Sequence, residues 1–260
     1  NSAINTGKRL ISSLSVDQIM AGWDKYDKKT ANVQTLINAT GLGIDEVNGY
    51  LEKLMWVSDE NSYAFTDMTA GLATMVSSGG DIKKLVPLLM GVANATAFAG
   101  KGAAEFSRVL QCGVNQADSL GYMQVQDWKT IEGATVNSKQ LMQTLIDAGV
   151  ALKEIEKGEI TTGTFRISLK DKWLTKEVME LGFGQFAEMS EKAYEMVQSG
   201  EVETASQAYE ILSEKYDTVS LTAAKAAQEA KTFTEAIDAT KDAVSSGWMK
   251  TFELIFGNYK

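Results

Sequence analysis

Apolar residues recur three and four positions apart along almost the whole chain, which is the spacing of one face of an α-helix. One such face consists of Ile19, Trp23, Tyr26, Thr30, Val33 and Ile37. Only one proline, Pro87, occurs in 260 residues, so few positions interrupt a helix. The sequence therefore predicts an all-α fold, with about ten short to medium amphipathic helices in a bundle-like module and little or no β structure.

Start and stop residues divide this pattern into segments. Thr175 and Thr204 are typical N-cap residues, since a side-chain oxygen there accepts a hydrogen bond from the first helical turn. Clustered glycines at 41–43, 79–80 and 182–184 are expected to punctuate the helices, because glycine favours helix ends and turns.

Two segments are less regular. Residues 56–65 (WVSDENSYAF) are polar at the centre and aromatic at the ends, so we expect a loop held to the core by its aromatic residues. Residues 159–169 (EITTGTFRISL) are β-branched and alternating, which is compatible with a β-hairpin. A turn followed by a short helix over residues 165–172 is the preferred interpretation, because both flanks are helical.

The helical pattern suggests two parts. Residues 1–155 form a helical module with core aromatics, and residues 156–260 form a second helical part that ends in an alanine-rich amphipathic helix; alternatively, the two parts make one domain. The aromatic residues expected in the structural core are Trp56, Phe65, Trp128, Trp173 and Trp248. The last helix is expected to pack against another helix through a seam of Ala226, Ala230, Phe233, Ile237 and Val244.

Composition limits the possible functions. The formal charge is −9 at pH 7 and no basic patch is visible, so specific binding to nucleic acid is not expected. The single cysteine, Cys112, cannot form an intrachain disulfide, and the absence of histidine excludes Cys/His zinc sites and His-based catalytic triads. The longest uncharged run, residues 85–100, is shorter than the roughly 20 residues of a membrane-spanning helix and is interpreted as a buried core helix.

No motif for catalysis is visible. The chain lacks a phosphate-binding loop, a G-x-S-x-G nucleophile elbow and an H-E-x-x-H metal motif. Carboxylate pairs such as Asp45/Glu46 and Glu201/Glu203 leave open a glycosidase, which needs two carboxylates and no histidine. Solvation and the helix dipole explain such pairs better. The sequence thus predicts no enzyme, and no catalytic, cofactor-binding or metal-binding residue.

Three stretches resemble the tape measure proteins of siphophages and related tailed phages. The first is 56–68 (WVSDENSYAFTDM), and the second is 121–134 (GYMQVQDWKTIEGA) followed by 147–152 (DAGVAL). The third, 225–259 (KAAQEAKTFTEAIDATKDAVSSGWMKTFELIFGNY), is the longest and most specific. Trp173 also lies in a turn similar to one in the family. The coiled coil, the hydrophobic segments and the peptidase or transglycosylase domains of such proteins have no counterpart in this chain.

The resemblance implies a structural and assembly role in a phage tail. A tape measure protein occupies the lumen of the growing tail tube, sets its length, and is ejected before the DNA at infection. The implied partners are the tail tube protein, tail assembly chaperones and tail tip or distal tail proteins, with a homo-oligomer in the tail. The implied locations are the virion and, during assembly, the host cytoplasm. Membrane contact would involve only other parts of the parent protein.

Other interpretations remain open at the level of sequence. The chain lacks an initiator methionine and a signal-peptide pattern, so we expect an internal piece of a longer polypeptide. A helical interaction domain of a surface or secretion protein is one alternative to the phage tail. A carboxylate-based glycan hydrolase is the other, and it requires two carboxylates facing one groove.

Overall fold

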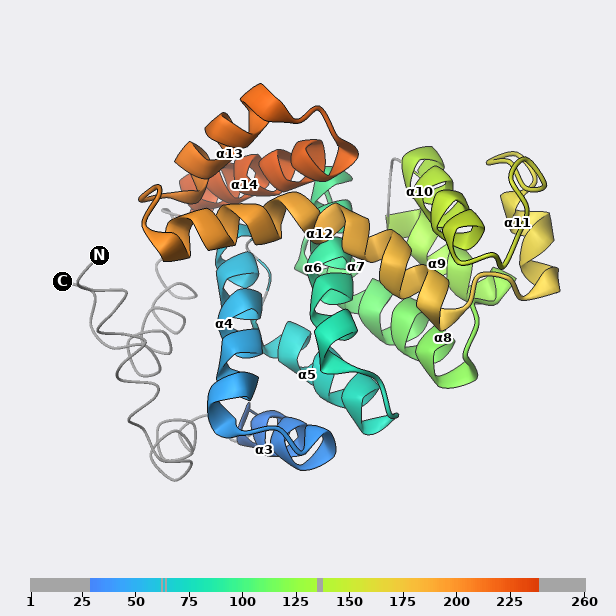
Figure 1. Ribbon diagram of the computed structural model, residues 1–260, viewed down its shortest axis with the longest axis horizontal. Helices are drawn as coiled ribbons and strands as arrows, with labels where there is room; N and C mark the ends of the chain where they lie inside the picture. Colours follow the sequence, from blue (N-terminus) through green and yellow to red (C-terminus); the bar gives the residue numbers. More distant parts are fainter. Residues whose placement is uncertain (1–28, 62, 64, 135–137, 239–260) are drawn as a thin grey trace.

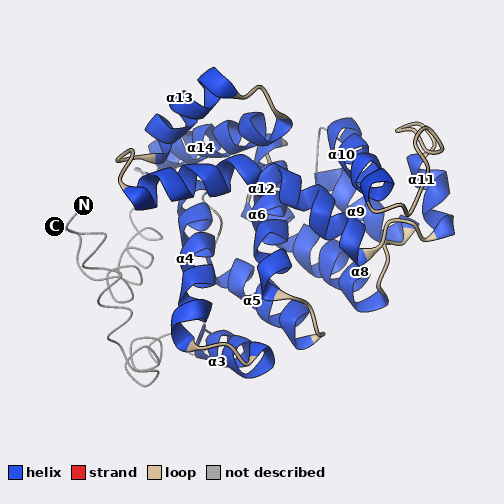
Figure 2. Ribbon diagram, in the orientation of Figure 1, coloured by secondary structure: helices blue, strands red, loops and turns tan. Residues whose placement is uncertain are grey.

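A computed structural model of the protein describes residues 29–61, 63, 65–134 and 138–238. Within these residues the protein is helical and contains no strand, as Figure 2 shows. A single isolated β-bridge, between Tyr122 and Thr175, joins two loops in the described part of the chain. The predicted all-α fold is confirmed.

The helices vary widely in length, and several short ones follow each other in the middle of the chain (Figure 1). They are α3 (Lys29–Thr40), α4 (Ile44–Asn61), α5 (Phe65–Ser77), α6 (Ile82–Phe98), α7 (Ala103–Arg108), the π-helical turn η1 (Val109–Val114), α8 (Asn115–Leu120), α9 (Val125–Ala134), α10 (Ser138–Ala151), α11 (Phe165–Ser168), the 3-10 turn η2 (Leu169–Asp171), α12 (Lys176–Ser199), α13 (Ala205–Lys215) and α14 (Val219–Asp238).

Local sequence explains where the longer helices begin and end. Thr175 caps α12, since its hydroxyl accepts a hydrogen bond from the Val178 N–H at 3.3 Å. Thr204 and Gln207 form a reciprocal capping box at the start of α13. Gly200 ends α12 in the left-handed conformation, which glycine adopts without steric cost. Both predicted N-caps are therefore confirmed.

Helices α6 and α12 cross at the centre of the molecule, and α6 is buried along most of its length. Their backbones approach closely because Gly91 of α6 faces the Phe183 carbonyl of α12. Gly182 similarly lets α12 approach Leu145 of α10. The prediction that the glycines at 182–184 punctuate helices is wrong, because both lie inside α12. Gly182 allows close packing there, whereas a Cβ at Gly184 would make only an ordinary contact.

Helix α12 changes direction partway along its length, between α6 and α14 (Figure 1). Near the middle of α12, Ser220 of α14 inserts its hydroxyl: it accepts a hydrogen bond from the Met189 N–H at 2.9 Å and donates one to the Phe186 carbonyl at 3.3 Å. Asn94 of α6 donates to the same carbonyl at 2.9 Å. Side chains that insert into a helix ladder are a known cause of such bends.

A buried polar network surrounds the bend. The Asn94 amide also donates to the Ser190 hydroxyl at 2.8 Å and accepts from the Asn61 amide at 3.1 Å. The Tyr209 hydroxyl donates to Ser190 at 3.3 Å, which brings α13 into the network. Buried polar groups are costly unless paired, so these hydrogen bonds specify how α4, α6, α12, α13 and α14 fit together.

The apolar core consists of two clusters that meet at this bend. The larger contains residues from Leu36 to Ala187, together with Ala223 and Ala227 of α14. The smaller joins the C-terminal half of α12, from Met189 onward, to α13 and α14. The larger core crosses residue 155, where two parts were expected to divide, so residues on both sides of that position share one core.

The two irregular segments have different outcomes. The loop expected over residues 56–65 is wrong for residues 56–61, because α4 continues to Asn61, and Tyr63 lies between α4 and α5. Asn61 is buried and its amide bonds to Asn94, so tertiary contacts favour the helix in a locally polar stretch. The turn and short helix preferred over residues 165–172 are confirmed, since α11 and η2 follow a turn and no hairpin forms there.

Candidate functional site

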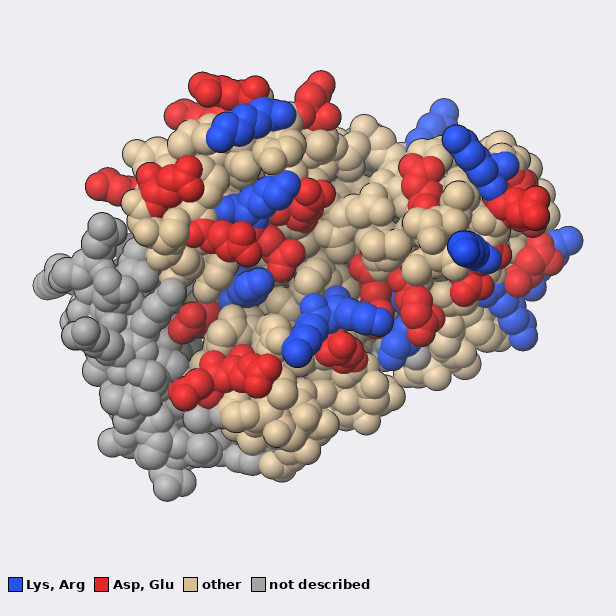
Figure 3. All heavy atoms as spheres, in the orientation of Figure 1, with Lys and Arg blue, Asp and Glu red and all other residues tan. Residues whose placement is uncertain are grey.

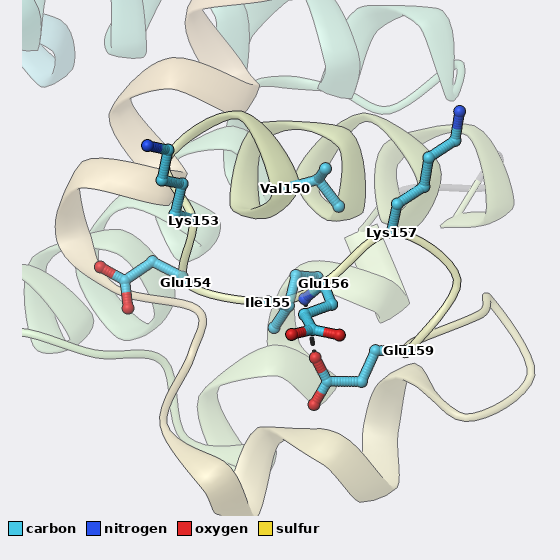
Figure 4. Close-up of a pocket in the computed structure, with 7 residues that line it drawn as sticks. All are labelled: Val150, Lys153, Glu154, Ile155, Glu156, Lys157 and Glu159. Atoms are coloured by element: carbon cyan, nitrogen blue, oxygen red, sulfur yellow. Dashed lines mark hydrogen bonds between the residues drawn. The ribbon is translucent and has the colours of Figure 1, made fainter.

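The described surface is hollowed beside the loop that joins α10 to α11, at the right-hand end of the molecule in Figure 1. One hollow, of about 470 Å³, lies against Val150 of α10, with Ile155 and charged loop residues around it (Figure 4). A second, of about 290 Å³, shares Ile155 with the first and extends to Ile160, Ile167 and Trp173. The two hollows therefore adjoin.

Three aromatic rings pack against each other next to the hollows: those of Trp128, Phe165 and Trp173, which we call the aromatic triad. The Trp128 and Phe165 ring centroids lie 4.6 Å apart, and those of Phe165 and Trp173 lie 5.4 Å apart in an edge-to-face arrangement. The Trp173 indole N–H donates to the Ser168 hydroxyl at 2.9 Å. Its ring packs so closely on Gly149 that a Cβ there would lie 2.9 Å from it. The aromatic triad thus fixes α11 and η2 against α9 and α10.

Polar contacts stabilise the loop between α10 and α11 and the segments that follow it. Arg166 binds Glu132 of α9 through two donors, with its Nε 2.8 Å from Oε2, and this hydrogen bonding raises the pKa of the Arg166 guanidinium. The Glu159 carboxylate accepts from the Glu156 N–H at 2.7 Å, which closes a turn. Lys172 lies over the Tyr122 ring, 4.8 Å from its centroid. One of these contacts lies within the loop, and the other two hold the segments that follow it.

Charged side chains of both signs surround the first hollow. Figure 4 shows the ammonium groups of Lys153 and Lys157 at opposite outer edges, pointing away from each other. The carboxylates of Glu156 and Glu159 lie together beside Ile155. In the part of the chain that the structure describes, no ion pair within 4.0 Å joins either glutamate to a lysine or arginine. The carboxylate of Glu154 lies at an outer edge, on the same side as Lys153. The inner wall is therefore acidic, and the outer edges carry both signs of charge.

The carboxylates that line the hollows lie in open surroundings. They are exposed to solvent, whereas a general acid of a glycosidase is usually partly buried. Burial does raise the pKa of Asp127, against an opposing backbone hydrogen bond from Gln124, but Asp127 lines neither hollow. Among the described residues, no group of three or more acidic or cysteine side chains is arranged to hold a metal ion.

The aromatic residues predicted in the core occupy different environments. Phe65, Trp128 and Trp173 are buried. Trp56 is half-buried within α4, where it touches both apolar clusters and meets the Tyr194 ring edge-on, with centroids 5.7 Å apart. Trp248 lies outside the described residues.

Only one residue of the predicted seam of the last helix, Ala226, has a described side chain. Ala223, Ala224 and Ala227 of α14 are buried, whereas Ala226 is half-buried. The side chains of Ala230, Phe233 and Ile237 are not among those described, and Val244 lies outside the described residues.

Comparisons with known proteins give no relative: no family model, no curated protein and no solved structure matches this chain. Within the described residues, none of the helices combines the length and apolar character needed to cross a membrane.

Proposed function

We propose that this chain is an internal segment of a phage tail tape measure protein, with a structural and assembly role. The observation that carries the proposal is the resemblance of residues 225–259 to a long segment of that family. Its described portion lies in α14, which is helical, alanine-rich and packed into both apolar clusters. The expected partners are the tail tube protein, assembly chaperones and tail tip proteins, with several copies of the chain in one virion.

The helical body is compatible with a role in length measurement, because an α-helix rises about 1.5 Å per residue. As one continuous helix, 260 residues would span about 390 Å. Here the helices fold back on each other, and α12, with 24 residues, spans only about 36 Å. A folded module would therefore contribute much less tail length than an extended one of the same mass.

The acidic surface suits a protein that shares a channel with DNA. Figure 3 shows acidic side chains gathered over α13 and the end of α12 that it packs against. The exposed acids there are Glu188, Glu195, Glu201, Glu203, Glu210, Glu214 and Asp217. Few lysines interrupt them, so this surface repels a phosphate backbone and does not retain the passing genome.

In-frame deletions in the parent gene test the proposal. One phage mutant would carry a deletion of residues 29–238. A second would carry a deletion of equal length in another part of the parent protein that is expected to set tail length. The tails of both would be measured by electron microscopy. We expect the second deletion to shorten the tail by at most about 1.5 Å per residue. The first should shorten it by less if the module is folded within the tail. Full-length tails in both mutants would contradict the proposal.

We also propose that this segment of the protein is not an enzyme. We expect no turnover when the purified chain is incubated with peptidoglycan and the soluble products are analysed by mass spectrometry. Turnover that is abolished by replacing a single carboxylate would favour the glycan hydrolase instead.

A further inference from the structure

Ile167 is the most exposed of the large apolar side chains in the described part of the protein, with 70% of its surface accessible. It lies on α11 between Arg166, which turns to Glu132, and Ser168, which receives the Trp173 N–H. A single exposed apolar residue is ordinary. Ile167 differs because it lines the second hollow together with Ile160 and Trp173. Ile167 forms an apolar wall that is open to solvent, and the buried Ile160 and Trp173 form the floor beside it.

The charges around this wall have a definite arrangement. The carboxylates of Glu156 and Glu159 lie together on the inner side of the adjoining hollow, while Lys153, Glu154 and Lys157 point outward (Figure 4). Glu154 and Glu159 also line the second hollow, together with Asp171 and Lys170. Carboxylates therefore outnumber ammonium groups around both spaces. A cationic group placed beside Glu156 and Glu159 would interact with two carboxylates, whereas an anionic group would be repelled.

We propose that the adjoining hollows are a docking site for a short segment of another protein, in which a large aliphatic side chain is flanked by lysine or arginine. The aliphatic side chain would cover Ile167, and the cation would lie between Glu156 and Glu159. The aromatic triad and the Arg166–Glu132 pair already fix the site, so binding requires little ordering of the loop. This proposal goes beyond the tape measure role and does not depend on it.

Nuclear magnetic resonance on the full 260-residue chain, labelled at isoleucine methyl groups, tests the site. The probe is a capped five-residue peptide with a central leucine between two lysines and glycine at each end. We expect saturable shifts of the Ile155, Ile160 and Ile167 methyl signals, with a Kd on the order of 1 mM or lower. The same peptide with glutamate in place of lysine should bind about tenfold more weakly.

Variants separate the two parts of the site. Ile167→Ser should weaken binding about tenfold because it removes the apolar wall, and Glu156→Gln should weaken it and reduce its dependence on salt. Leu120→Ser is the matched control, since Leu120 is 50% exposed and lines neither hollow; it should bind like the unmodified chain. The inference is overturned by the absence of saturable shifts, by equal binding of the glutamate peptide, or by unchanged binding of Ile167→Ser in a chain with an unaltered melting curve.

Discussion

A Cβ on Gly91 would overlap the carbonyl oxygen of Phe183 and lie 2.6 Å from its carbonyl carbon. The obstacle is the backbone of α12, which cannot move aside as a flexible side chain can. We expect Gly91→Ala to separate α6 from α12 and to lower the free energy of unfolding by about 3 kcal/mol or more, the upper range for overpacked cores. Chemical denaturation followed by circular dichroism measures this loss.

Gly184→Ala is the matched control for that experiment. Gly184 lies inside α12 one residue after Phe183, and the nearest atom to an added Cβ is the Pro87 Cβ at 3.8 Å, an ordinary contact. Alanine favours helix over glycine by roughly 1 kcal/mol, so this variant should be neutral or more stable. Equal stability of the two variants would contradict the close packing at Gly91.

The two buried tryptophans of the aromatic triad should respond differently to conservative replacement. Either alanine variant should cost about 3–5 kcal/mol. Trp173→Phe also loses the hydrogen bond to Ser168, whereas the buried Trp128 N–H has no partner among the described residues. We therefore expect Trp173→Phe to cost about 1 kcal/mol more than Trp128→Phe. Thermal unfolding of the four variants provides the comparison, and the reverse order would refute it.

Periodicity predicts the fold class and many helices of this protein because apolar spacing and N-caps are local properties. Thr175 and Thr204 each act on backbone groups within three residues, so their role is visible in the sequence. The end of α4 is not local: Asn61 is helical because its amide meets Asn94, 33 positions away. The position of Gly182 inside α12 is not local either, since only the neighbouring Leu145 of α10 shows why a glycine is needed there.

The candidate site is harder to predict than the fold. Trp128 and Trp173 were recognised as core residues from their helical spacing, and together with Phe165 they form its support. The hollow itself depends on how the loop after α10 returns to α11, which no periodicity encodes. For the polar network, the sequence offers one indication: Asn94 is a polar residue within the uncharged stretch at 85–100.

Three buried tyrosines should keep their protons in the folded protein at alkaline pH. Burial raises the pKa of Tyr63, Tyr194 and Tyr209 above the ordinary tyrosine value, and nearby glutamates add to the effect. In the unfolded chain they ionise near pH 10. Their contribution to stability is therefore constant below about pH 10 and is lost progressively as the pH rises above it.

Tyrosinate absorbance measured alongside circular dichroism tests this expectation. The signal from the three buried residues should appear together with unfolding, and Tyr209→Phe should remove one of the residues that ionise in that step. Ionisation of all tyrosines while the helical signal is still complete would contradict the assigned burial.

The bend of α12 should depend on the hydroxyl of Ser220. Ser220→Ala removes the acceptor of the Met189 N–H and one donor to the Phe186 carbonyl, in a buried site. We expect a loss of about 1–3 kcal/mol in unfolding free energy and faster hydrogen exchange at the Met189 amide. Thr222→Ala is the control on the same helix, because its exposed hydroxyl bonds only to the Thr218 carbonyl one turn earlier, and it should change stability by no more than about 0.5 kcal/mol. If Ser220→Ala behaves like this control in both measurements, the bend is set by apolar packing and not by the inserted hydroxyl.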